Sequence, residues 1–180
     1  MASIKYTLFF DGCDTMVIDR FKSIFNYVEG DQSFRDFYTI INNLHGTSHS
    51  ETEHPEQDWI NNNVGVSTLN GKIEFIDIDT DTVSLTIVSP GECIPFIQSI
   101  VTDINLNYKD DVRVSGDYES FTFETCGVVV GGDNREVVKH VFDMTNYDIS
   151  EMVENSQALI TWGGDLLDFR SQKYSEFLGS

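Results

Sequence analysis

The hydrophobic periodicity of this chain changes from that of a strand to that of a helix and back, and the order of these changes limits the folds open to it. Hydrophobic and polar residues alternate over residues 3–10, which predicts a strand with one buried face. Over residues 17–28 the hydrophobic positions recur every three or four residues. This spacing predicts a helix, with Asp14 or Thr15 as its N-cap and Gly30 at its end.

The same two patterns recur further along the chain. Residues 72–79 and 83–88 predict a hairpin, and the helical spacing returns over residues 94–104. Strands are then expected from residue 112 through Phe121 and Phe123 to residue 130, and over 137–142 after a glycine-rich turn.

Two regions are less regular. Residues 33–44 fit either a helix or a strand, and both alternatives stay open. Near the C-terminus one helical stripe covers residues 149–160 and another covers 166–178. The run Trp162, Gly163, Gly164 predicts a break between them.

The predicted order is strand, helix, two-stranded hairpin, helix, strand. This is the βαββαβ order of the ferredoxin-like sandwich, an α+β fold in which two helices cover one face of a mostly antiparallel sheet. We therefore expect a ferredoxin-like domain over residues 1–142. Residues 143–180 are expected to form a C-terminal helical appendage packed on the same domain.

Several residues in this order also carry a family resemblance: Trp59, Asn63 and Gly65, then Ser89 and Pro90 after the hairpin, then Tyr118 and Glu119. In these residues the chain resembles the YubB ferredoxin-like family over residues 3–142. That family is carried by plasmids and phages, and its function is largely undefined. The resemblance implies a small mobile-element protein and supplies no catalytic residue.

The charge of the chain narrows the choice of partner. Eleven Lys and Arg stand against 30 Asp and Glu, which gives a formal net charge of -19 at pH 7. Nucleic-acid binding depends on clustered Lys and Arg that displace counterions from phosphates, and here the bases are scattered singly. An acidic protein is also repelled by anionic membranes, and no stretch approaches the ~20 apolar residues of a spanning helix. We expect the partner to be a basic protein, with no direct binding to nucleic acid or membrane.

The first residues and the cysteines bear on location. Residues 1–10 lack a charged leader and a long apolar run, so no signal peptide is predicted and a cytoplasmic location is expected, in the host if the protein is phage-encoded. Cys13, Cys93 and Cys126 are odd in number and far apart, which favours buried reduced thiols over disulfides or a zinc site.

An alternative function rests on the polar segment 45–63. His45, His49 and His54 lie there among several carboxylates up to Asp58, so nitrogen and oxygen ligands for zinc or nickel are close in sequence. The alternative is therefore a small metal-dependent enzyme or ligand-binding domain that uses the His45–Asp58 loop. The spacing is loose, and a solvated acidic loop is the favoured interpretation.

The remaining motifs do not indicate catalysis. Asp77, Asp79 and Asp81 match the first ligands of a calcium loop, but Thr82 stands where that loop needs glycine. There is no nucleophile elbow, P-loop or dinucleotide fingerprint, so we expect no cofactor and no catalytic residue. RNA binding through Phe121 and Phe123 on an open sheet face is a further alternative that the acidic charge disfavours.

The acidic residues near the C-terminus are the strongest functional feature. Residues 143–168 contain no Lys, Arg or His and six carboxylates: Asp143, Asp148, Glu151, Glu154, Asp165 and Asp168. Asp148, Glu151 and Glu154 are expected on the polar side of one helix, in a row of negative charge. Such a row speeds encounter with basic partners, and it can also serve only to keep a domain soluble.

These observations lead to one expected function. We expect a non-catalytic acidic accessory protein of a phage or plasmid that binds a basic surface of a host or viral protein through the six carboxylates. Because duplex DNA carries a charge every ~1.7 Å along its axis, a rigid acidic surface can also occupy a phosphate-binding site. Inhibition of a nucleic-acid-processing or defence enzyme by DNA mimicry is thus the more specific expectation.

Overall fold

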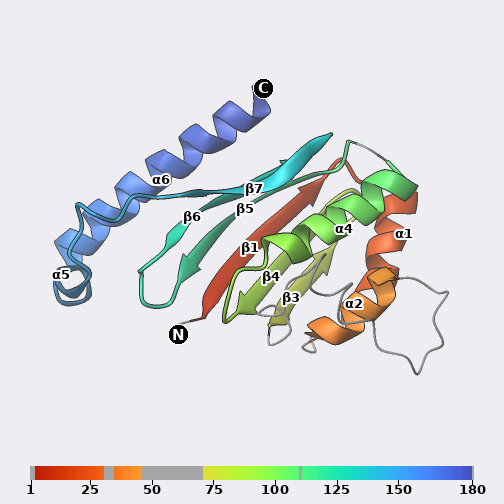
Figure 1. Ribbon diagram of the computed structural model, residues 1–180, viewed down its shortest axis with the longest axis horizontal. Helices are drawn as coiled ribbons and strands as arrows, with labels where there is room; N and C mark the ends of the chain where they lie inside the picture. Colours follow the sequence, from red (N-terminus) through yellow and green to blue (C-terminus); the bar gives the residue numbers. More distant parts are fainter. Residues whose placement is uncertain (1–2, 31–34, 46–70, 110, 180) are drawn as a thin grey trace.

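An antiparallel sheet forms the frame of the computed structural model, which describes residues 3–30, 35–45, 71–109 and 111–179. Its strands are β1 (Ile4–Asp11), β2 (Arg35–Asp36), β3 (Lys72–Ile78), β4 (Val83–Ser89), β5 (Arg113–Ser120), β6 (Cys126–Gly132) and β7 (Arg135–Val141). They lie in the order β2-β3-β4-β1-β5-β6-β7, so the first long strand is central and the last is at an edge (Figure 1). The expected α+β class and mostly antiparallel sheet are confirmed.

Strand β1 shows how the alternating sequence sets the two faces of the sheet. Tyr6, Leu8 and Phe10 are fully or almost fully buried, whereas the intervening Thr7 and Phe9 are exposed. Phe10 lies opposite Val83 on β4 and Val114 on β5, and all three side chains are buried. This inner face of the sheet therefore holds the main core.

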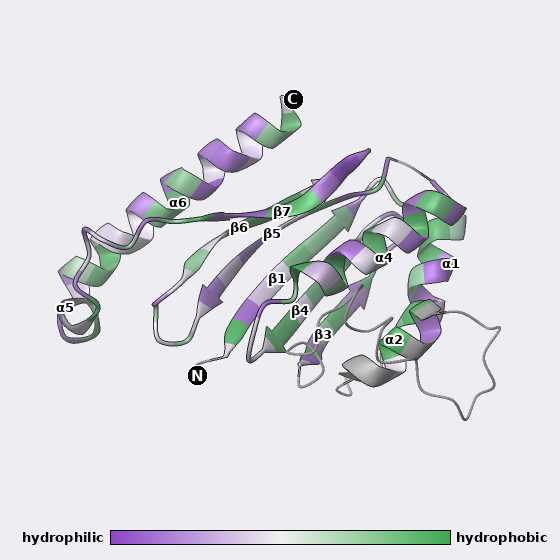
Figure 2. Cartoon of the chain, viewed as in Figure 1, coloured by the Kyte–Doolittle hydropathy of each residue, from purple (hydrophilic) through white to green (hydrophobic). Residues whose placement is uncertain are grey.

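Within the described residues, the inner face is covered by α1 (Thr15–Ile24), α2 (Phe37–His45) and α4 (Ile94–Asn107). Their buried side chains join those of the strands in one hydrophobic cluster. On α4, Ile97, Ile100 and Ile104 are fully buried at helical spacing, and Figure 2 shows hydrophobic and hydrophilic residues following one another along this helix. The expected helix at 94–104 is confirmed.

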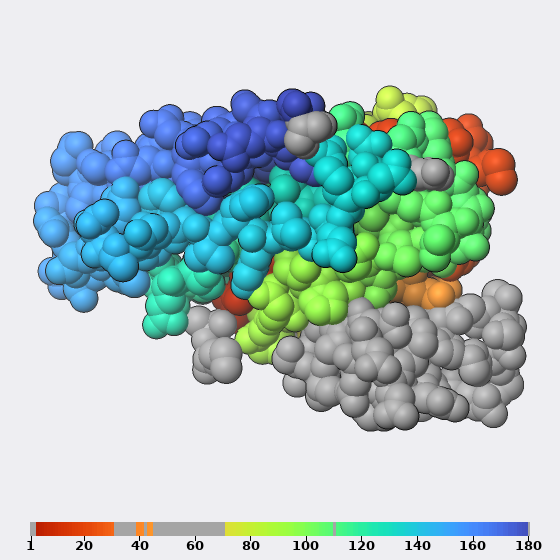
Figure 3. All heavy atoms as spheres, turned by 45° about the horizontal axis from the view of Figure 1, so that its top comes forward, coloured from red at the N-terminus to blue at the C-terminus, as the bar shows by residue number. Residues whose placement is uncertain are grey.

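Two further helices, α5 (Ile149–Glu154) and α6 (Ser156–Leu178), follow the last strand. They pack through a second, smaller cluster that includes Cys126 of β6, while Val129 of the same strand points into the main cluster. Strand β6 is therefore buried on both faces. Figure 3 shows α6, in dark blue, beside the cyan atoms of the last strands.

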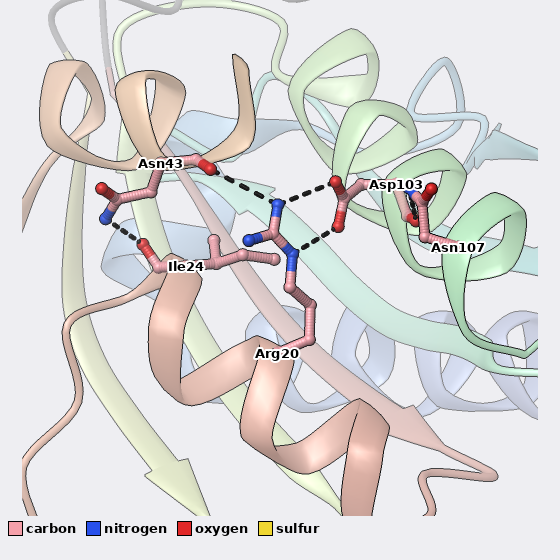
Figure 4. A network of polar contacts seen from close by, with 5 residues as sticks. All are labelled: Arg20, Ile24, Asn43, Asp103 and Asn107. Carbon is pink, nitrogen blue, oxygen red and sulfur yellow. Dashed lines mark hydrogen bonds and ion pairs between the residues drawn. The ribbon is translucent and has the colours of Figure 1, made fainter. Parts of the chain in front are cut away.

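A polar network ties the helices of the inner face to one another (Figure 4). Arg20 of α1 donates two hydrogen bonds of 2.8 Å to the carboxylate of Asp103 on α4, and a third of 3.3 Å to the main-chain oxygen of Asn43 on α2. The Asn43 amide in turn donates to the main-chain oxygen of Ile24 at 2.7 Å. A bidentate Arg–carboxylate pair fixes orientation as well as distance, so α1, α2 and α4 are held as one layer.

The structure corrects several boundaries. Helix α1 has the expected N-cap, Asp14, which accepts a hydrogen bond from the Val17 N–H at 3.0 Å, but it ends at Ile24 and leaves Val28 exposed outside it. Of the two alternatives for residues 33–44, the helix is confirmed as α2 and the strand over Phe37–Ile41 is wrong, because only the two-residue β2 precedes the helix.

Two expectations about the second half of the chain are wrong. Phe121 and Phe123 lie in the turn between β5 and β6, not in a strand, so they cannot stack bases across the sheet. The C-terminal helix is not broken at Gly163 and Gly164, because α6 runs without interruption through both.

Candidate protein-binding surface

The α5–α6 unit is held to the sheet by its own aromatic cluster. Trp162 of α6 is almost fully buried, and its ring meets that of Phe123 edge-on at a centroid distance of 5.2 Å. The Trp162 indole N–H donates to the sulfur of Met144 at 3.2 Å. Phe142 packs edge-on against Phe169 at 5.3 Å. These contacts fix the start and the middle of α6.

Polar contacts fix the rest of α6. The Arg170 guanidinium donates to the main-chain oxygens of Gly127 and Tyr118, both at 3.1 Å, and it forms an ion pair of 3.5 Å with Asp117. One turn later the Tyr174 hydroxyl donates to the same carboxylate. Burial and this hydrogen bond raise the pKa of Tyr174, so the phenol stays protonated and the contact persists across the physiological range.

Three of the six predicted carboxylates have structural roles. Asp143 accepts hydrogen bonds from the Thr145 N–H and hydroxyl at 3.0 and 2.7 Å, and these bonds lower the pKa of Asp143. Asp148 is the N-cap of α5 and accepts from the N–H of Glu151 at 3.2 Å. These two carboxylates organise the chain before α5.

Asp165 of α6 forms the third such contact. It accepts a hydrogen bond of 2.5 Å from the Tyr147 hydroxyl, which links the loop before α5 to α6. This hydrogen bond is the main reason that the pKa of Tyr147 rises to about 12, because it stabilises the protonated phenol.

The other three carboxylates are available to a partner. Glu151 and Glu154 on α5 and Asp168 on α6 are exposed, and their side chains form no ion pair or hydrogen bond within the described part of the chain. Asp148, Glu151 and Glu154 do follow one helix, as the N-cap of α5 and two of its residues, although Asp148 is used in capping. The six carboxylates are spread over a loop, an N-cap and two helices, and half of them are already engaged.

A cavity of about 300 Å³ lies between α5 and α6. Asp148 and Glu151 line it from one side, and Gln157 and Thr161 line it from the other. The lining combines carboxylates with neutral hydrogen-bonding groups, and Met152 supplies an apolar wall. Such a recess suits an Arg or Lys side chain, whose stem is apolar and whose head is cationic.

The basic residues are mostly used within the protein. At least seven of the eleven Lys and Arg form ion pairs with carboxylates: Arg20, Lys109, Arg113, Arg135, Lys139, Arg170 and Lys173. The positive charge is thus neutralised locally. The excess of carboxylates remains to set the field outside the protein.

One partly buried group of titratable residues was not predicted from the sequence. Lys139 of β7 forms an ion pair with Glu92, which also accepts a hydrogen bond from the Tyr6 hydroxyl at 3.3 Å. Burial raises the pKa values of Tyr6 and Cys93 beside it. Both groups therefore stay neutral, and this cluster joins the start of α4 to the sheet.

The alternative metal site is not tested by the structure. His45 is the last residue of α2, but its side chain and the whole of His49 and His54 lie outside the described residues. Within the ranges that are described, no group of three or more His, Cys, Asp or Glu side chains is placed to hold a metal ion. All three cysteines are buried free thiols, as the sequence predicts.

The residues that build this surface were only partly visible in the sequence. The acidic composition of 143–168 identified the carboxylates, but nothing in the pattern identified Arg170, Tyr174 or Tyr147 as their support.

None of the helices in the described ranges is long and apolar enough to cross a membrane. Searches of family models, curated proteins and solved structures give no match to this chain, so the functional argument rests on its geometry.

Proposed function

We propose that this protein is a non-catalytic acidic accessory protein that binds a basic surface of a host or viral protein. The observation that carries the proposal is the set of three exposed carboxylates, Glu151, Glu154 and Asp168, on a helical pair fixed rigidly to the sheet. A rigid surface loses little conformational entropy on binding, so its charges can contribute to affinity as well as to the rate of encounter.

The finer fold belongs to the same proposal. The order β3-β4-β1-β5, with α1 between β1 and β3 and α4 between β4 and β5, supports a ferredoxin-like unit to which β6, β7, α5 and α6 have been added. The resemblance of residues 3–142 to the YubB ferredoxin-like family supports an origin in a phage or plasmid. Action in the host cytoplasm follows from that origin.

A basic partner can be engaged in two ways at once. Its Lys and Arg side chains are attracted by the exposed carboxylates, and one of them can enter the cavity beside Asp148 and Glu151. Enzymes that process nucleic acids present such basic surfaces to phosphates. Occupation of that surface would inhibit them by nucleic-acid mimicry.

The proposal is tested by affinity capture from bacterial lysate at about 50 mM salt, where screening is weak. The test variant carries Glu151→Gln, Glu154→Gln and Asp168→Asn. The control carries Glu74→Gln, Asp77→Asn and Asp81→Asn, three exposed carboxylates of the β3–β4 hairpin, so both variants lose the same amount of negative charge.

We expect the wild type and the hairpin control to retain a basic, nucleic-acid-binding protein that 300 mM salt or added duplex DNA releases. The α5–α6 variant should retain at least tenfold less of it. If both variants lose the partner equally, net charge alone is responsible and the proposed surface is wrong. If the wild type retains no basic protein at low salt, the proposed function itself is wrong.

A further inference from the structure

Helix α6 carries an exposed hydrophobic stripe that the fold does not use. Ile160, Leu167 and Leu178 are 66%, 63% and 63% exposed, respectively. Together with Gly164 and Ser171 they are spaced four, three, four and seven residues apart, which places all five on one side of the helix. Trp162 and Leu166, which anchor α6 to the sheet, lie on the other side of the helix.

The two glycines of α6 have no role in intramolecular packing. A glycine inside a helix costs about 1 kcal/mol relative to alanine, and α6 has two in succession. A Cβ atom placed on Gly163 or Gly164 would meet nothing within 4 Å. Close packing inside the protein therefore does not explain them. Gly164 forms a notch between Ile160 and Leu167, the kind of site where a second helix can approach closely.

We propose that this stripe binds a basic amphipathic helix of the partner, whose hydrophobic face lies along α6. The inference rests on the proposed function and specifies the class of partner segment. Asp168, the exposed carboxylate next to Leu167, lies on one flank of the stripe. It is placed to attract Lys or Arg on the border of a hydrophobic helical face, which is the usual arrangement of a helix in a groove.

The charge of the region selects a basic helix over a second copy of this chain. Residues 143–168 carry six carboxylates and no Lys, Arg or His. A second copy of this chain would bring another formal net charge of -19 to the interface, and opposed like charges disfavour an interface. A basic helix would be attracted to the same groups.

The end of the stripe offers an anchoring position. From Ile160 to Leu178 the helix rises about 27 Å, so a partner helix of roughly 18 residues matches its length. Leu178 also lines a cavity of about 240 Å³, together with Phe9, Tyr174 and Phe177. A large apolar side chain of the partner can fill this cavity, as central anchors do in other interfaces.

Three synthetic peptides of 21 residues test the proposal by fluorescence anisotropy against the full chain at 50 and 300 mM salt. The first has a Leu face flanked by Lys, the second has the same composition in scrambled order, and the third has Glu in place of Lys. We expect the first to bind at least tenfold more tightly than the second and third.

Variants of the stripe sharpen the test. Ile160→Ser with Leu167→Ser should remove the preference for the amphipathic peptide. Val28→Ser with Leu106→Ser, at exposed positions away from α6, is the matched control and should keep the preference. Gly164→Leu enlarges the hydrophobic surface but fills the notch, so it should weaken binding at least fivefold while the protein stays folded by circular dichroism.

The outcomes separate the two proposals. Equal affinity for the ordered and scrambled basic peptides would overturn the stripe and leave the acidic surface standing. Failure of both basic peptides to bind at low salt would count against the proposed function as well. Tighter binding by the Gly164→Leu variant would show adventitious hydrophobic contact. A dimer in sedimentation experiments that Leu167→Ser abolishes would identify a second copy as the occupant. Each of these last two results overturns the proposal.

Discussion

The guanidinium of Arg170 donates to the main-chain oxygen of Tyr118 at 3.1 Å, which joins α6 to β5 across 52 positions of the chain. The same guanidinium reaches the oxygen of Gly127, the residue that lies opposite Tyr118 on β6. One side chain therefore bridges two strands and the helix. Because the Arg170 side chain is only 15% exposed, water cannot readily replace these bonds.

Replacement of Arg170 by methionine keeps most of the apolar stem and removes the bridge. We expect Arg170→Met to lower the free energy of unfolding by about 2 kcal/mol, because hydrogen bonds from charged donors contribute more than neutral ones. Urea denaturation followed by tryptophan fluorescence measures the change. Lys173→Met is the control: its ion pair with Glu176 is more exposed, so a loss of about 0.5 kcal/mol or less is expected. Equal losses would contradict the bridging role.

When its hydrophobic cluster is weakened by mutation, the α5–α6 unit should detach from the sheet without unfolding the main core, because the two hydrophobic clusters are separate. Trp162→Ala removes the largest side chain of the smaller cluster, at a cost of about 3 kcal/mol. Hydrogen exchange should then speed up in α5 and α6 while β1 and α4 stay protected. Phe96→Ala, in the main cluster, should speed exchange throughout the sheet. A uniform increase in the Trp162→Ala variant would mean that the unit does not open independently.

Elements that depend on neighbouring residues were predicted well. The alternation in β1, the β3–β4 hairpin and the spacing of α4 each involve positions a few residues apart, so their pattern is complete within a short window. The end of α1 was not predicted correctly. Val28 continues the helical spacing, but Asn26 adopts a φ of 49°, which ends the helix before Val28 is reached.

Tertiary contacts overrode local propensity in α6. Gly163 and Gly164 favour a break, yet Trp162, Leu166 and Arg170 are held against the sheet on both sides of the pair. The residues that these side chains contact are far away in the sequence, so the local pattern around the two glycines does not include them. Helix continuity therefore depended on residues that lie far away in the chain.

In the candidate surface too, local features could be predicted from the sequence and contacts between distant residues could not. Its negative charge was evident from composition, but which carboxylates are free depends on contacts such as that between Tyr147 and Asp165, 18 residues apart. Local capping by Asp148 follows a known pattern at helix starts. Arg170 holds α6 to strand residues that lie 43 and 52 positions away in the chain, and no periodic pattern in the sequence predicts such contacts.

Buried cysteines should be unreactive in the folded protein. Burial raises the pKa of Cys13 to about 12 and that of Cys126 to about 11. At pH 8 a thiol with pKa 11 is ionised to about one part in a thousand, against about a quarter for an ordinary pKa of 8.5. Folding therefore keeps these thiols protonated until the pH approaches their raised pKa values.

We expect a disulfide reagent such as dithiobis-nitrobenzoate to modify almost no thiol of the native chain at pH 8 and all three in urea. Trp162→Ala should expose Cys126 selectively, because Cys126 belongs to the smaller cluster and Cys13 and Cys93 belong to the main one. Peptide mapping of the modified thiols distinguishes the sites. Rapid modification of Cys93 in the native wild type would contradict its burial.

Alanine at Gly164 should stabilise the protein, since the added methyl group meets nothing within 4 Å and the helix loses a flexible residue. We expect a gain of about 1 kcal/mol in the free energy of unfolding, seen as a higher midpoint in urea. Gly116→Ala is the contrasting control, because its Cβ would lie 2.2 Å from the main-chain oxygen of Thr7 on β1. That close approach requires glycine, so the control should lose stability. A loss of stability in Gly164→Ala would mean that the glycine serves the fold itself, and the notch on α6 would then need no partner to explain it.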